Sequence, residues 1–118
     1  MKHENDMYSI AWFKLAECVA RREQERAFGL YRLLAHSFDD QAFAQQLAGD
    51  LYRAFDDDKS AIEKYEQAAY LYEQGGRSRE AAAVYDHLKT INPDEKRYQE
   101  AAASAWTAAK SAKMMSAE

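Results

Sequence analysis

Side chains that could carry out chemistry are few and scattered in this chain. Its one cysteine, Cys18, lies among apolar residues, and no histidine or basic residue stands beside it in a motif that would make it a nucleophile. The three histidines, His3, His36 and His87, form no HxxxH or HExxH pair that would place two imidazoles on one helix face. We therefore expect a buried structural thiol at Cys18 and no bound metal.

The acidic run at residues 56–58 superficially suggests a cation site, but it lacks the alternating ligands and the glycine of a calcium loop. A solvated helix start is the simpler interpretation of these carboxylates. The chain also contains no glycine-rich phosphate loop, no nucleophile elbow and no paired-acid motif. We expect a protein that is not an enzyme and uses no cofactor, so binding is its natural function.

Length and charge narrow the class of protein further. The 118 residues fit one domain spanning residues 1–118, with a short polar segment at residues 1–5. A net charge of -4 argues against nucleic acid as the main partner, because phosphate binding favours a basic surface. No window is apolar enough to cross a membrane, and the polar start is unlike a signal peptide. The sequence predicts a cytoplasmic protein.

The elements that must position any binding residues are helices. The chain has only 4 Gly and 1 Pro, few β-branched residues and many strong helix formers, so the predicted fold class is all-α. Apolar periodicity predicts six helices, near residues 6–23, 25–37, 40–55, 59–74, 78–90 and 94–113. Residues 21–26 mix charges of both signs, which predicts a solvated surface. They contain no helix breaker, so one long helix over residues 6–37 remains an alternative.

Short polar side chains and turn residues mark the other helix boundaries. The residues expected to cap helix N-termini are Asp39-Asp40, Asp57-Asp58, Ser78 and Asp94. The expected stop signals are Gly75-Gly76 and Asn92-Pro93. We expect Gly76 to take a positive φ angle, and we expect Tyr72 and Tyr85 to be buried between the two helices that flank it.

An internal repeat appears at an offset of 34 residues, the tetratricopeptide period. This offset aligns Ala27 with Ala61, Tyr31 with Tyr65, Leu34 with Ala68, Phe38 with Tyr72 and Leu51 with Tyr85. The best single unit covers about residues 62–95 and contains Ala69-x2-Tyr72, Gly76 at the turn and Ala81-x3-Tyr85-x2-Leu88 before Pro93. The chain thus resembles the tetratricopeptide-repeat (TPR) family, and residues 61–72 are similar to the soluble NSF attachment protein branch.

The resemblance implies a right-handed α-solenoid of antiparallel helical hairpins whose concave face holds a peptide or helix of a partner protein. It leaves the repeat phase open: either the second, fourth and sixth helices line the concave face, or the first, third and fifth do. The first phase is favoured because Gly76 and Pro93 lie at the expected breaks. The partner-binding residues it predicts on the inner face include Arg32, His36, Glu66, Tyr70 and Glu73.

That inner face is acid-leaning, because Glu63 and Glu100 also belong to it. We therefore expect a basic or amphipathic partner segment. The clamp by which related repeat domains hold acidic tails of heat-shock chaperones is not present, since its Asn positions read Glu17 or His36, Gly49 and Tyr70.

The first predicted helix is apolar on almost every side over two turns. Tyr8 and Trp12 are four residues apart and share a face, whereas Phe13 points about 100° away. One neighbouring helix covers only one of these directions. We expect an association surface built on Tyr8, Trp12 and Phe13, used for a homo-oligomer or a client. The predicted function is an adaptor or scaffold, and the alternative is a small chaperone that shields an apolar segment of a client such as a secreted protein.

Overall fold

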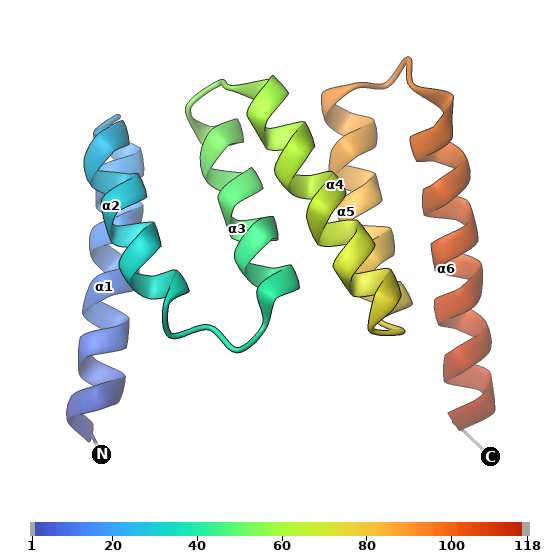
Figure 1. Cartoon of the computed structure of the whole chain (residues 1–118), viewed down its shortest axis with the longest axis horizontal. Helices are drawn as coiled ribbons and strands as arrows, with labels where there is room; N and C mark the ends of the chain where they lie inside the picture. Colours follow the sequence, from blue (N-terminus) through green and yellow to red (C-terminus); the bar gives the residue numbers. More distant parts are fainter. Residues whose placement is uncertain (1, 117–118) are drawn as a thin grey trace.

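A computed structural model describes the backbone of residues 2–116 and the side chains of residues 9–114. Within these residues the chain forms six helices and no strand, which confirms the all-α class (Figure 1). The helices are α1 (Lys2–Ala20), α2 (Gln24–Ala35), α3 (Gln41–Ala54), α4 (Asp58–Gln74), α5 (Ser78–Ile91) and α6 (Lys96–Ser116). Consecutive helices run antiparallel, and the whole is a flat body of 40 × 39 × 19 Å (Figure 1).

Three helices end in the same way, with one residue in the left-handed conformation. Arg22 (φ 61°), Asp56 (φ 63°) and Gly76 (φ 70°) follow α1, α3 and α4. In each case the next residue donates its amide hydrogen back across the turn, as Glu23 does to the carbonyl of Cys18 at 2.9 Å. The positive φ expected at Gly76 is confirmed. The single helix over residues 6–37 is wrong, because the chain reverses at Arg22.

Helix starts agree with the sequence at two of four positions. Asp40 accepts a hydrogen bond from the amide of Phe43 at 3.1 Å, and Asp57 accepts one from the amide of Ser60 at 3.2 Å. The other two expected caps are wrong. Ser78 is the first helical residue of α5, behind Arg77 as the capping position, and Asp94 lies two residues before α6 begins at Lys96.

The larger of two hydrophobic cores joins α3, α4, α5 and α6. Tyr65, fully buried, packs so closely on α3 that a Cβ added at Gly49 would lie 2.8 Å from its ring. The alanines of this core allow the helices to approach closely, and those with no exposed surface are Ala61, Ala68, Ala69, Ala81 and Ala82. Tyr72 is buried as expected. Tyr85 is only half-buried, because its hydroxyl reaches out to Glu73.

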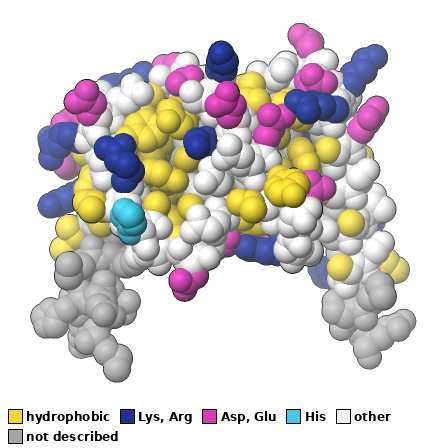
Figure 2. Space-filling view, in the orientation of Figure 1, with side chains coloured by type: hydrophobic (Ala, Val, Ile, Leu, Met, Phe, Trp, Pro, Cys, Tyr) yellow, Lys and Arg dark blue, Asp and Glu magenta, His cyan; other side chains and the backbone are white. Residues whose placement is uncertain are grey.

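The smaller core lies between α1, α2 and the edge of α3, and it contains the buried thiol expected at Cys18. Much of it consists of half-buried aromatic rings. Phe28 meets Tyr52 and Phe55 with ring centroids 4.7 and 6.2 Å apart. Hydrophobic side chains therefore remain visible at the surface between α2 and α3 (Figure 2).

Arg22 connects the turn between α1 and α2 to the C-terminal end of α3. Its guanidinium donates to the carbonyl of Ala54 at 2.6 Å and to the carboxylate of Asp56 at 2.9 Å, and it lies over the ring of Phe55. Most of residues 21–26 are exposed, as expected, but Arg22 also makes these tertiary contacts. This residue joins two helix turns that are 34 residues apart in sequence.

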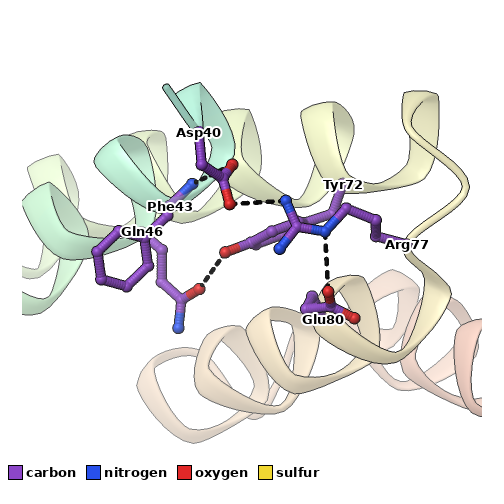
Figure 3. A network of polar contacts seen from close by, with 6 residues as sticks. All are labelled: Asp40, Phe43, Gln46, Tyr72, Arg77 and Glu80. Carbon is purple, nitrogen blue, oxygen red and sulfur yellow. Dashed lines mark hydrogen bonds and ion pairs between the residues drawn. The ribbon is translucent and has the colours of Figure 1, made fainter. Parts of the chain in front are cut away.

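A polar network closes the opposite end of α3 against the turn between α4 and α5 (Figure 3). Arg77 donates to Asp40 at 2.7 Å and to Glu80 at 2.8 Å, and it covers the ring of Tyr72. The hydrogen bond from Arg77 lowers the pKa of Glu80. Burial alone would raise the pKa of Asp40, but hydrogen bonds from Arg77 and Phe43 outweigh it and lower that pKa.

Candidate functional site

The most extensive surface depression among the predicted partner-binding residues lies over α4. We call it the α4 hollow. It has a volume of about 480 Å³ and is lined by Gln45, Glu63, Glu66, Gln67, Tyr70 and Leu71. Glu66 and Tyr70 were predicted partner-binding residues, and Glu63 was assigned to the same face, so the structure brings these three together on consecutive turns of α4.

Apolar surface at the α4 hollow comes from Tyr70 and Leu71. The Tyr70 side chain is 61% exposed although α4 is the central helix of the larger core. Large aromatic side chains left open to water are typical anchor points of protein interfaces. The hollow therefore combines an exposed ring with carboxylates one and two turns away.

Gln45 supplies an unused acceptor to the same hollow. Its side-chain oxygen is buried and has no hydrogen-bond donor within the described part of the chain. A buried acceptor without a partner costs free energy that a bound donor would recover. A ligand N–H group would recover this cost only if the Gln45 side chain turned its buried oxygen toward the hollow.

The carboxylates of α4 differ in how they are engaged. Glu66 accepts hydrogen bonds from Arg97 at 2.6 Å and from Tyr98 at 2.9 Å, so its charge is partly balanced by α6. Burial of the Tyr98 hydroxyl is the main cause that raises the pKa of this residue, and the hydrogen bond to Glu66 raises it further. Glu63 makes no ion pair with any described residue, which leaves its negative charge available.

Glu73, a further predicted partner-binding residue, lies outside the α4 hollow. It accepts a hydrogen bond from the hydroxyl of Tyr85 at 2.5 Å. Burial of the phenol, together with this hydrogen bond, raises the pKa of Tyr85. Glu73 therefore joins α4 to α5 and is not brought together with Tyr70 around one depression.

Arg32 and His36 lie in a separate depression at the end of α2. It has a volume of about 380 Å³ and is lined by Tyr31, Arg32, Ala35, His36, Phe38 and Gln41. The Tyr31 hydroxyl donates to the carbonyl of Ala44 at 2.7 Å and ties this depression to α3. The predicted inner-face residues are thus divided between the depression at α2 and the α4 hollow, and Glu73 lies outside both.

Helix α1 carries the remaining predicted residues. Trp12 is half-buried and stacks on Phe38 with ring centroids 6.1 Å apart, whereas the side chain of Phe13 is 71% exposed. Ile10 is exposed beside it, at 53%. The side chain of Tyr8 lies outside the described residues. The structure therefore directs Trp12 toward the smaller core and leaves Phe13 open to water.

Sequence reasoning missed Gln45, Gln67 and Leu71 as parts of the α4 hollow. The positions of Gln67 and Leu71 on the face of Glu63 and Tyr70 could have been read from helical spacing. Gln45 comes from α3, and nothing in its local sequence indicates that it meets α4 there.

Neither a model of a known protein family nor a curated protein sequence matches this chain. Within the described residues no helix is both long and apolar enough to span a membrane.

Proposed function

We propose that this protein is a non-enzymatic interaction module that binds a peptide or helix of a partner protein in the α4 hollow. The observation that carries the proposal is the exposed ring of Tyr70 beside the unpaired carboxylate of Glu63 and the unpartnered oxygen of Gln45. A rigid helical scaffold that presents aromatic, acidic and acceptor groups around one depression suits recognition of a side chain and a backbone segment.

The chemistry of the α4 hollow defines the partner segment. Tyr70 and Leu71 favour an aliphatic or aromatic side chain, Glu63 favours a Lys or Arg, and Gln45 favours an N–H donor. A basic amphipathic segment provides all three. The lining residues run along α4 from Glu63 to Leu71, so the segment would lie along this helix.

We further propose a TPR-like right-handed α-solenoid as the architecture behind this surface. Three pairs of residues that are 34 positions apart in the sequence support this proposal. The left-handed residues Arg22 and Asp56 are 34 positions apart and hydrogen bonded to each other, and Arg53 contacts His87, again 34 positions away. The aligned alanines Ala27 and Ala61 are both fully buried.

A display library of 12-residue peptides selected on the immobilised protein tests the binding proposal. We expect enrichment of sequences that pair Lys or Arg with a nearby aromatic or aliphatic residue. Binding of a selected peptide should weaken by about tenfold or more in Tyr70→Ala, since truncating an aromatic anchor costs about 2 kcal/mol. Glu63→Gln should weaken it by a smaller factor and reduce its salt dependence.

Matched changes outside the hollow serve as controls. Leu33→Ala removes an exposed apolar side chain on α2, and Glu100→Gln removes an exposed carboxylate on α6. Leu33→Ala should leave peptide affinity unchanged, and Glu100→Gln should too if the α4 hollow, which Glu100 does not line, is the binding site. Selection of acidic peptides, or binding that is insensitive to Tyr70→Ala, would rule out the α4 hollow as the peptide site.

Phe13 and Ile10 support a second candidate function, a chaperone or self-association surface on α1. Two neighbouring exposed apolar side chains favour a covering partner, either another copy or an apolar client segment. Light scattering at increasing concentration tests self-association. We expect Phe13→Glu to shift an oligomer to monomer, whereas Ala103→Glu, an equal charge change on α6, should not. A wild-type protein that stays monomeric and binds no apolar peptide through α1 excludes this role.

A further inference from the structure

Helix α6 is longer than the helix on which it packs, and this difference creates a corner at the lower end of the molecule. α6 has 21 residues and α5 has 14. At about 1.5 Å per residue, α6 runs about 10 Å past the start of α5. Figure 1 shows the end of α6 continuing beyond the turn between α4 and α5. A depression of about 570 Å³ lies in this corner, lined by Arg79, Trp106, Ala109, Lys110, Ala112 and Lys113.

The lining of this α5–α6 corner is cationic and aromatic. Arg79 comes from the first turn of α5, while Trp106, Lys110 and Lys113 follow one another at helical spacing on one face of α6. Among the residues whose side chains the structure describes, no carboxylate lines the depression. Three cations therefore converge in a protein whose net charge is -4.

The Trp106 ring is oriented so that a flat group of a ligand can stack on it. Its indole N–H donates to the carboxylate of Asp86 at 3.0 Å, which fixes one edge of the ring, and the side chain remains 43% exposed. Asp86 is itself paired with Lys89 at 3.6 Å, so its negative charge is shared with a cation outside the corner. The small side chains of Ala109 and Ala112 leave space beside the ring.

The start of α5 adds positive potential to the same corner. The dipole of a helix places partial positive charge at its N-terminus, which the carboxylate of Glu80 in the first turn of α5 offsets in part. Arg79 and Lys110 make no ion pair with a described residue. An anion that enters the corner would meet two cations that are not held in an ion pair, although the charge of Arg79 also acts on the neighbouring Glu80.

We propose that the α5–α6 corner binds a small organic anion that carries a flat apolar group. The anionic group lies among Arg79, Lys110 and Lys113, and the flat group packs against the indole of Trp106. The volume of the corner is within the range of small-ligand sites, about 300–1,000 Å³. Charged hydrogen bonds and ring contact act together, so each part of the ligand should bind poorly alone. This site has the opposite charge preference to the α4 hollow and does not depend on it.

Titration with 1-naphthyl phosphate, inorganic phosphate and 1-naphthol tests the proposal. Calorimetry gives the affinities, and the indole N–H signal of Trp106 in ¹⁵N-resolved NMR spectra, assigned with Trp106→Phe, gives the location. We expect 1-naphthyl phosphate to bind one to one and to shift the Trp106 signal, with an affinity about tenfold or more above that of either fragment. Lys110→Gln and Arg79→Gln should each weaken it by about threefold to tenfold.

Lys96→Gln is the matched control, because it removes the same charge from the opposite end of α6. It should leave the affinity unchanged. The proposal fails if Lys96→Gln weakens binding as much as Lys110→Gln, if 1-naphthol binds as tightly as its phosphate, or if the Trp106 signal does not respond. A phosphotyrosine peptide compared with phenyl phosphate then distinguishes a peptide side chain from a free small molecule as the source of this chemistry. Tighter binding of the peptide indicates the former, and equal affinity the latter.

Discussion

The two ends of this molecule are held together by different kinds of interior. In α3 to α6, alanines allow close helix contact around fully buried rings such as Tyr65, and Val84 and Leu88 also have no exposed surface. In α1 and α2 the only residue without exposed surface is Ala27 among those described, and much of the remaining core consists of half-buried aromatics. The first interior excludes water, whereas the second is open along its joint with α3.

This difference predicts unequal stability along the chain. Close-packed buried side chains contribute most to the free energy of unfolding, and segments with few buried contacts open first. Phe28 and Arg22 carry the joint between α2 and α3, and both are accessible to solvent. We infer that α3 to α6 form the stable platform that presents the α4 hollow, and that α1 and α2 open more readily.

The largest expected effect is loss of the platform by Tyr65→Ala. The Tyr65 ring fills the space beside Gly49 and stacks on the His87 ring, with ring centroids 5.2 Å apart. Its hydroxyl donates a hydrogen bond to Asp50. Truncation of so large a buried side chain should lower the free energy of unfolding by about 3–5 kcal/mol. Denaturant unfolding followed by circular dichroism measures it.

Tyr65→Phe is the control for that change, because it keeps the ring and removes only the hydroxyl. Its cost should be about 1 kcal/mol, the net contribution of one hydrogen bond. Equal losses in the two variants would mean that the hydrogen bond, and not the packed ring, stabilises the platform.

A smaller and local effect is expected from Phe28→Ala. The change removes the ring that meets Tyr52 and Phe55, and the site is half-buried, so the loss should be about 2 kcal/mol. We expect α1 and α2 to unfold locally while α3 to α6 stay folded. Amide hydrogen exchange should therefore rise about thirtyfold in α1 and α2 and change little in α4 and α5.

Leu33→Ala provides the comparison for Phe28→Ala on the same helix, since Leu33 is largely exposed and should cost little. Exchange that rises equally in all six helices after Phe28→Ala would show that the two cores unfold as one unit. The distinction between the two ends of the molecule would then be lost.

Helical periodicity was sufficient to predict the platform. Several positions that align at 34 residues, such as Ala27, Ala61 and Tyr65, are completely buried, whereas Tyr31, Phe38 and Tyr85 are half-buried. Periodicity also predicted the break between the first two helices, but no breaker residue marks it, because the left-handed Arg22 is stabilised by tertiary contacts with Ala54, Asp56 and Phe55. Local sequence contains no signal for contacts of that kind.

The candidate sites were predictable only in part, for a related reason. Spacing on one helix indicates which side chains share a face, and this placed Glu63, Glu66 and Tyr70 together. The separation between helices determines where a depression forms, and it brings in Gln45 from α3.

The smallest expected effect is a change in acid sensitivity, and it belongs to the platform alone. Hydrogen bonds from Arg77 and Phe43 lower the pKa of Asp40 in the folded state below its usual value of about 4. Between the two pKa values the unfolded chain binds more protons than the folded one, so stability rises with pH there. The contribution is fully present above about pH 4 and is lost as the pH falls through the folded pKa. Because the pair is partly exposed, it should amount to about 0.5 kcal/mol.

Asp40→Asn isolates this contribution, since asparagine caps a helix about as well as aspartate but does not titrate. The difference in free energy of unfolding between wild type and Asp40→Asn should be largest near neutral pH and should shrink as the pH is lowered to about 2. Arg77→Gln removes the partner and should flatten the same part of the acid profile, at a larger overall cost because Arg77 also holds Glu80 and covers Tyr72. Parallel profiles for wild type and Asp40→Asn would show that the ion pair does not link α3 to the turn between α4 and α5 energetically. The close packing around Tyr65 would then account for the stability of the platform without it.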